Sequence, residues 1–143
     1  MSSFEELVLN TSALTTTNYR TSARIFTNRE NWGFKKAHSN ETVFVEKCIV
    51  LNSETQQLAY DAASAYSQID GENELSIRRS PDVFMGDKIR VSQKSFYQSH
   101  IDAPKVLTEF VLEQSKLLGD NLQCVDLYCG VGIFAIALAK AGH

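Results

Sequence analysis

Apolar and polar residues alternate in the first half of the chain, and this period of two predicts β-strands. Residues 19–27 and 32–36 show it most clearly, and the polar turn 28–31 lies between them. A third strand is expected in residues 41–51, whose apolar positions first alternate and then follow one another. These positions are Val43, Val45, Ile49 and Val50.

The spacing of apolar residues changes after residue 52. Residues 53–66 are rich in Ala and Gln and carry apolar side chains at helical intervals, so a helix is expected there. The polar segment 68–73 predicts a loop. Two further strands are expected in residues 75–78 and 88–93, linked by the turn residues Pro81-Asp82 and Gly86-Asp87.

The last third of the chain alternates between helix, strand and helix. Asp102 is expected to cap a helix with Pro104 in its first turn, where the missing N–H costs nothing, and Gly119 is expected to end it. A strand is expected over residues 123–127 and a second helix over residues 133–141. The apolar face of the first helix consists of Val106, Leu107, Phe110, Val111, Leu117 and Leu118.

This order of elements predicts an α+β chain with two domains. Residues 1–18 form an irregular lead, and residues 19–95 form a β-rich central domain with an antiparallel sheet. Residues 96–143 contain a linking helix and the first β-loop-α unit of a doubly wound, Rossmann-like domain. Because such a sheet needs several more strands, we expect this domain to be truncated at His143, with the apolar face of its last helix uncovered.

Composition and charge add two limits. Hydrophobic residues make up 43% of the 143 residues, which suffices for one ordinary domain, and the formal net charge of −3 gives no global basic field for nucleic acid. No apolar stretch is long enough to span a membrane and no signal peptide is visible, so we expect a cytoplasmic protein. No two of the three cysteines are spaced as a CxxC pair, and their odd number argues against a closed disulfide framework.

The basic residues are unevenly distributed along the chain. Several lie between residues 20 and 36, a stretch with a single acid, Glu30. They are Arg20, Arg24, Arg29, Lys35 and Lys36. This cluster is compatible with a phosphate-contacting face, and a solvated hairpin surface explains it equally well.

A loop with two glycines precedes the last predicted helix. Gly130 and Gly132 allow a tight turn and a close approach of the backbone to a ligand, and the helix behind them presents free N–H groups. Asp126 is expected to orient the loop by accepting backbone N–H bonds, and Tyr128 supplies a flat face. Ala135 replaces the third glycine of the dinucleotide fingerprint, and the Gly-Lys-Ser/Thr ending of a P-loop is absent. A cofactor without a pyrophosphate is therefore favoured.

Residues 126–134 have the sequence Asp-Leu-Tyr-Cys-Gly-Val-Gly-x-Phe. This segment resembles the first cofactor motif of the RNA uracil-C5 methyltransferases, which use S-adenosylmethionine. Phe96-Tyr97-Gln98 is similar to their Phe-x-Gln motif, and Tyr19-Arg20-x-x-Ala23-Arg24 is similar to the signature of their central domain. Residues 33–48 look like the hairpin and strand of the branch that acts on ribosomal RNA. These four segments follow one another in the family's order and cover most of the chain.

The resemblance implies a role for each matching residue. Gln98 would contact the cofactor or the target region, and Tyr128 would lie beside S-adenosylmethionine. Gly130 and Gly132 would turn around the amino-acid end of the cofactor. Ile133 departs from the family, because many members carry a polar residue directly after the second glycine.

The resemblance also implies the reaction and its partners. The full enzyme would transfer a methyl group to C5 of a uridine, with 23S ribosomal RNA as the expected substrate, and Arg20, Arg24, Lys35 and Lys36 would contact the RNA. The nucleophilic cysteine and the base of this family lie in later motifs, beyond His143. We therefore expect no catalytic residue in the chain, no activity of the chain alone, and a missing C-terminal segment as a partner.

Cysteines and histidines are the remaining candidates for chemistry. Cys48 falls where the iron–sulfur branch of the family places its last cluster ligand, but the closely spaced trio of other ligands is absent. We expect no metal, and Cys48 is either an orphaned ligand or a small buried apolar residue. Cys124 and Cys129 are expected to be packing residues. The histidines, namely His38, His100 and His143, are expected to lie at the surface.

Two other functions compete with the methyltransferase hypothesis. In the first, the chain is a non-catalytic RNA-binding or vestigial product of a split or truncated reading frame. Its surviving functional part would be the β-rich domain. A generic adenosylmethionine- or nucleotide-binding enzyme of another substrate class would account for the glycine loop alone. The Phe-x-Gln segment and the Tyr19-Arg20 segment argue against that second alternative.

Overall fold

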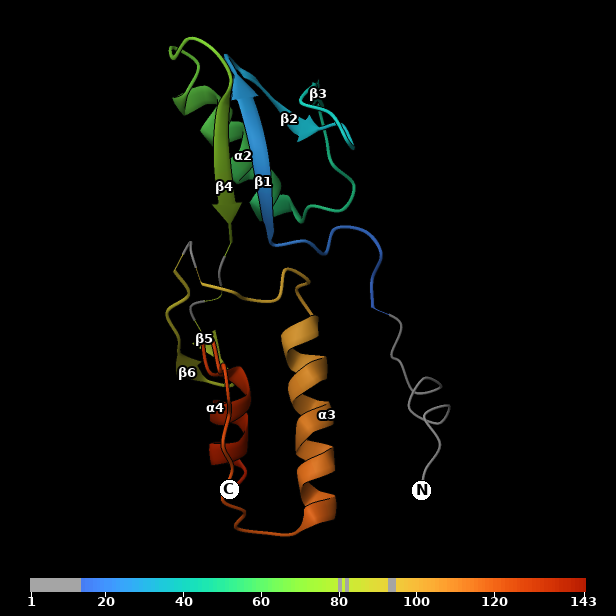
Figure 1. Cartoon of the computed structure of the whole chain (residues 1–143), viewed down its shortest axis with the longest axis vertical. Helices are drawn as coiled ribbons and strands as arrows, with labels where there is room; N and C mark the ends of the chain where they lie inside the picture. Colours follow the sequence, from blue (N-terminus) through green and yellow to red (C-terminus); the bar gives the residue numbers. More distant parts are fainter. Residues whose placement is uncertain (1–13, 80, 82, 93–94) are drawn as a thin grey trace.

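The computed structural model describes residues 14–79, 81, 83–92 and 95–143, and these form two parts. One part is a four-stranded sheet with a helix, and the other contains two helices beside a small hairpin. Figure 1 shows the two parts stacked along the long axis of the molecule, with β1–β4 at one end and α3 and α4 at the other. Residues 1–13 of the predicted lead, Asp82 of the predicted turn and Gln93 of the predicted strand lie outside the described residues.

The first part is built on an antiparallel sheet with the strand order β3-β2-β1-β4. Phe26 of β1 pairs with Gly33 of β2 on one side and with Glu74 of β4 on the other, so β1 is central. The antiparallel sheet predicted for this part is confirmed, as are its first two strands and the turn between them. The strands are β1 (Ser22–Asn28), β2 (Asn31–Lys35), β3 (Thr42–Phe44) and β4 (Asn73–Arg78).

β3 is much shorter than the strand predicted over residues 41–51. The carbonyl oxygen of Ile49 accepts a hydrogen bond from the N–H of Asn18 at 2.8 Å, and that of Val50 accepts one from the N–H of Arg20 at 2.8 Å. The N–H of Cys48 donates to a side-chain oxygen of the next helix. Because these backbone groups bond elsewhere, the chain leaves the sheet after β3.

Gly33 explains how closely β3 approaches β2. A β-carbon on Gly33 would lie 2.0 Å from the carbonyl oxygen of Val43, a distance that no side chain can occupy. Gly33 is buried in β2, between its partners Phe26 of β1 and Phe44 of β3. The glycine therefore permits the backbones of β2 and β3 to touch at this point.

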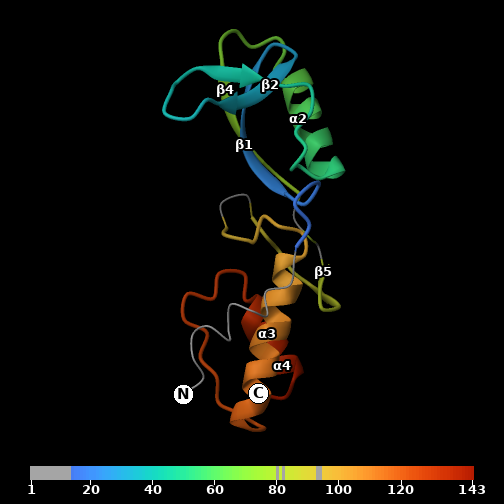
Figure 2. The same cartoon turned by 90° about the vertical axis from the view of Figure 1, so that its right-hand side faces the viewer.

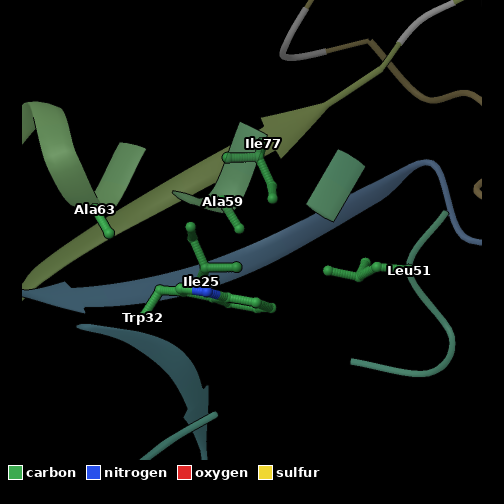
Figure 3. Packing of buried hydrophobic residues seen from close by; sticks show 6 residues of the cluster. All are labelled: Ile25, Trp32, Leu51, Ala59, Ala63 and Ile77. Carbon is green, nitrogen blue, oxygen red and sulfur yellow. The ribbon is translucent and has the colours of Figure 1, made fainter. Parts of the chain in front are cut away.

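α2 (Ser53–Ala65) packs on one face of the sheet and encloses the core (Figure 2). The helix begins at Asn52, whose Oδ1 accepts a hydrogen bond from the N–H of Thr55 at 2.8 Å. Small residues at Ala59 and Ala63 let the helix approach the strands closely. The helix predicted over residues 53–66 is confirmed. The buried cluster, drawn in Figure 3, consists of Ile25, Trp32, Leu51, Ala59, Ala63 and Ile77.

A short hairpin follows β4. β5 (Val83–Phe84) pairs with β6 (Asp87–Lys88), and the turn residues Met85 and Gly86 have positive φ angles of 50° and 86°. The strand predicted over residues 88–93 is wrong for the described residues 89–92, which belong to no strand. The sequence predicts that residues 88–93 form a strand linked by turns to β4. β4 pairs with β1 instead, and Lys88 pairs only with the short strand β5.

α3 (Ala103–Leu118) confirms the helix predicted between Asp102 and Gly119, although Asp102 makes no side-chain cap bond. The apolar face predicted for this helix is wrong in part. Its buried residues are Pro104, Thr108 and Ser115, whereas Leu107, Phe110, Leu117 and Leu118 are exposed. The hydroxyls of Thr108 and Ser115 bond to carbonyls of the helix itself, which makes these residues compatible with burial.

α4 (Ile133–Lys140) confirms the last predicted helix and packs against α3. Ile133 and Ala137 are buried, and Phe134, Ile136 and Leu138 are half-buried. The prediction of an uncovered apolar face on this helix is therefore wrong, because α3 covers it. No helix in the described part of the chain combines the length and the apolar character that a membrane crossing needs.

The segment before α4 differs from the predicted strand over residues 123–127. The structure assigns no strand there, and Val125 and Leu127 are 82% and 76% exposed. Cys124 and Cys129 are also exposed, so their predicted packing roles are wrong. A strand needs a hydrogen-bonded neighbour, and none of the described residues pairs with this segment as a strand. Its assignment to a doubly wound domain stays a prediction.

Candidate functional site

The glycine loop turns sharply before α4. Tyr128, Gly130 and Gly132 have positive φ angles of 62°, 59° and 78°. The N–H of Gly132 donates to the carbonyl oxygen of Cys129 at 2.8 Å and closes the turn. The sequence therefore places glycine at two positions where a side chain would strain the backbone.

The start of α4 presents unpaired backbone donors. Gly132 is the cap residue, and it has no side chain that could accept the first N–H groups of the helix. Within the described residues, the N–H groups of Ile133, Phe134 and Ala135 have no acceptor. Such donors, with the positive end of the helix dipole, attract a carboxylate or another anion.

Asp126 and Tyr128 lie on the same loop but are placed differently. One oxygen of Asp126, Oδ2, is buried without a hydrogen-bond partner in the described part of the chain. The prediction that Asp126 accepts backbone N–H bonds is therefore wrong for this oxygen. Tyr128 is fully exposed, so its ring is available to a ligand.

The Phe-x-Gln segment meets the glycine loop through its backbone. The carbonyl oxygen of Phe96 lies 3.9 Å from the position of a β-carbon on Gly130. Gln98 lines a cavity of about 320 Å³ between the sheet part and the start of α3. That cavity is also lined by Tyr97, and burial raises the pKa of the Tyr97 phenol. The structure thus brings the two motifs together through the backbone of Phe96.

Tyr19 and Arg20 join the two parts of the molecule. The Tyr19 ring stacks on the His100 ring at a centroid distance of 4.5 Å, and the Tyr19 carbonyl oxygen accepts from the N–H of Ile101 at 2.9 Å. The Arg20 carbonyl oxygen accepts from the N–H of Asn52 at 3.0 Å. The ring of His100 is half-buried and held by these contacts, so it is less exposed than the predicted surface histidine.

Carboxylates on neighbouring segments pair with most of the basic residues predicted to contact RNA. Arg24 lies 3.2 Å from Glu74, and Lys36 lies 3.6 Å from Glu41. Arg20 differs, because its Nε donates to the carbonyl oxygen of Ser22 at 2.8 Å. The acids come from β4 and from the segment before β3, so the charge count over residues 20–36 missed them.

Lys35 is the most strongly engaged of the basic residues. Its ammonium contacts the carboxylate of Glu72 and lies 4.5 Å from the centroid of the Phe26 ring. The hydroxyl of Thr42 also donates to Glu72. The hydrogen bond from Lys35, followed by that from Thr42, holds the pKa of the Glu72 carboxyl below its usual value.

Two proteins from different strains of Bacillus cereus, both named uncharacterized RNA methyltransferase, are similar to this chain. Each is 43% identical to it over 58 residues, which make up 40% of this chain and 12% of the relative. The chain resembles RNA methyltransferases over this segment. The matched segment is thus a small part of the length of these curated relatives. No family profile matches the chain, and no solved structure matches it.

The described residues offer no cluster of three or more side chains that could hold a metal ion. Cys48 is half-buried and packs against the core of the sheet part, as the apolar alternative predicts. Its N–H donates to Oε1 of Gln56 at 2.9 Å. The two predicted roles of Cys48 are an orphaned cluster ligand and a small apolar residue. Its surroundings are those of a packing residue.

Proposed function

We propose that this chain is part of an S-adenosylmethionine-dependent RNA methyltransferase that modifies C5 of a uridine in 23S ribosomal RNA. The similarity to two RNA methyltransferases supports the class of reaction. The observation that carries the choice of cofactor is the start of α4, where a glycine cap leaves the first N–H groups without acceptors. The uridine and the ribosomal substrate rest on the resemblance of the Phe96-Gln98 and Tyr19-Arg24 segments to the uracil-C5 family.

The residues of the glycine loop suit the chemical groups of S-adenosylmethionine. The N–H groups of Ile133 and Phe134 fit its carboxylate, and the unpaired Oδ2 of Asp126 fits a donor such as its amino group. The exposed Tyr128 ring offers a flat face to the adenine or ribose. When bound, the cofactor supplies a methyl group made electrophilic by the sulfonium. Gln98 would contact the cofactor or the target region, and Gly130 and Gly132 would form the turn around the amino-acid end.

In this proposal residues 19–95 contact RNA and residues 96–143 begin the cofactor domain. Arg20 is the first candidate for a phosphate contact, because it alone of the four predicted residues has no carboxylate partner in the described part of the chain. Arg24, Lys35 and Lys36 would have to exchange a carboxylate for a phosphate. The nucleophile and the base would come from a further segment, so the chain alone would be inactive.

Binding of S-adenosylmethionine to the purified chain tests the cofactor assignment. We expect weak binding in equilibrium dialysis, and we expect Gly132→Val to abolish it, because a branched side chain is strained at a φ of 78°. Gly71→Ala, at a φ of 87° in the sheet part, is the matched control that should leave binding unchanged. Tighter binding of a dinucleotide or of ATP would contradict the proposal.

Deletion of the gene that encodes the chain tests the reaction. We expect one 5-methyluridine to disappear from 23S ribosomal RNA, as measured by mass spectrometry of nuclease digests. Loss of a different modified nucleotide would contradict the uridine C5 assignment. An unchanged RNA, together with RNA binding by the purified chain, would support the non-catalytic alternative.

A further inference from the structure

A second cavity, of about 400 Å³, lies in the sheet part of the molecule. Residues of β2, β3 and α2, together with the segments beside them, line it, so it lies at the end of the molecule away from α4 (Figure 1). The residues that decide its chemistry are three aromatic rings and two carboxylates. These are Trp32, Phe44, Tyr60, Glu30 and Glu46.

The aromatic residues form partly open walls around this cavity. Phe44 and Tyr60 are 41% and 40% exposed, whereas Trp32 is only 2% exposed and belongs to the core. The Trp32 and Tyr60 rings meet edge to face at 5.8 Å. The Tyr60 hydroxyl donates to the carbonyl oxygen of Glu46 at 2.6 Å, which fixes the ring at the cavity. The Tyr60 ring is therefore held in place, and the Tyr60 and Phe44 rings are both accessible.

The charges at this cavity are negative and unpaired. Neither Glu30 nor Glu46 has an ion-pair partner among the described residues, in contrast to Glu41, Glu54, Glu72 and Glu74. No described lysine or arginine lines the cavity. Carboxylates and the faces of aromatic rings both attract cations, and both repel phosphate. The cavity is thus complementary to an organic cation and unsuited to RNA.

An independent observation comes from Trp32. Its Nε1–H is buried and has no acceptor among the described residues, although indole N–H groups usually find a partner when buried. A small inorganic cation would not provide an acceptor. A peptide would, because it carries carbonyl oxygens next to a charged side chain. The unpaired donor therefore favours a peptide ligand.

We propose that this cavity binds an arginine side chain of a partner protein. The guanidinium would lie against the Phe44 and Tyr60 rings and donate to the carboxylates of Glu30 and Glu46. A carbonyl oxygen of the same peptide would reach the buried Nε1–H of Trp32 after a shift of that ring toward the cavity. Arginine is favoured over lysine because its guanidinium is planar, stacks on rings and carries five donors. This inference does not rest on the methyltransferase proposal, since it uses neither the glycine loop nor RNA.

N-acetyl-arginine N-methylamide is the probe for this site, and N-acetyl-citrulline N-methylamide is its neutral control of nearly the same shape. Trp32 is the only tryptophan of the chain, so its fluorescence and its indole N–H signal in NMR report on the cavity directly. We expect a saturable change with the arginine probe at millimolar concentration. The citrulline probe should bind about tenfold more weakly, because it lacks the positive charge.

Substitution of the carboxylates gives the second readout. Glu30→Gln combined with Glu46→Gln keeps the side-chain shape and should weaken the arginine probe about tenfold. Glu113→Gln, an exposed position on α3, should change nothing. Equal affinity for the two probes, unchanged binding by the double variant, or no response of Trp32 would overturn the proposal. Tighter binding of the corresponding lysine probe would overturn the choice of arginine.

Discussion

The carbonyl oxygen of Phe96 lies 3.9 Å from the point that a β-carbon of Gly130 would occupy. The two residues belong to different segments that the sequence connects only through resemblance to one enzyme family. Their proximity means that the Phe-x-Gln segment and the glycine loop border one region of the molecule. Gln98 lines the cavity at the start of α3.

The caps of α2 and α3 should differ in their contribution to stability. Asn52 caps α2 with a hydrogen bond to the N–H of Thr55, whereas Asp102 makes no side-chain bond at the start of α3. We expect Asn52→Ala to lower the free energy of unfolding by about 1 kcal/mol and Asp102→Ala to lower it by less than about 0.5 kcal/mol. Urea unfolding followed by circular dichroism measures both values. Equal losses of unfolding free energy in the two variants would show that the Asn52 hydrogen bond does not stabilise α2.

The close contact between β2 and β3 should make Gly33 intolerant of any side chain. A β-carbon there would meet the carbonyl oxygen of Val43 at 2.0 Å, so β3 would have to move. We expect Gly33→Ala to lower the free energy of unfolding by about 1–3 kcal/mol. Ser76→Ala, at an exposed position of β4, is the control and should change it by less than about 0.5 kcal/mol. A neutral Gly33→Ala variant would contradict the strand arrangement.

The stability of the sheet part should depend on pH through Glu72. Its pKa in the folded chain is lowered from 4.5 by hydrogen bonds from Lys35 and Thr42, so the folded state favours the ionised carboxyl. This contribution is present above the ordinary pKa and is lost as the pH falls through the lowered one. Glu72→Gln should therefore be less stable than the unchanged chain at pH 7 and equally stable at strongly acidic pH.

Urea unfolding at several pH values measures the difference between the two chains. Glu113→Gln serves as the control, because Glu113 has no ion pair among the described residues, and its effect should stay small throughout. A difference for Glu72→Gln that persists at strongly acidic pH would mean that the ionised carboxyl is not what stabilises the fold. An NMR titration of the Glu72 carboxyl gives the direction of the pKa shift directly.

The end of α3 and the segment before α4 expose apolar side chains that should promote association. Leu117 and Leu118 are exposed on α3, as are Val125 and Leu127 after it. We expect Leu117→Gln with Leu118→Gln to reduce light scattering and dye binding at high concentration. The free energy of unfolding should change by less than about 0.5 kcal/mol, because neither side chain is buried. Ile133→Gln, at a buried position of α4, should instead destabilise the chain.

Local patterns in the sequence determined the elements that depend only on neighbouring residues. The period of the apolar residues and the polar turn 28–31 predicted the hairpin of β1 and β2. Asn52, followed by residues that favour helix, set the start of α2. Gly119 and Gly132 marked the end of α3 and the start of α4, since both adopt backbone angles that suit glycine. These features need no information from distant parts of the chain.

Tertiary structure decided which of these elements find partners. Residues 48–50 lie outside the sheet because residues 18–20 and Gln56 bond to their backbone. Residues 123–127 form no strand because none of the described residues pairs with them. The carboxylates opposite Arg24 and Lys35 come from β4 and the loop before it, so they were invisible in a count along the chain. Pairing and burial depend on residues that are distant in the sequence. Only the fold brings those residues together, and the local spacing of apolar and polar residues does not predict these contacts.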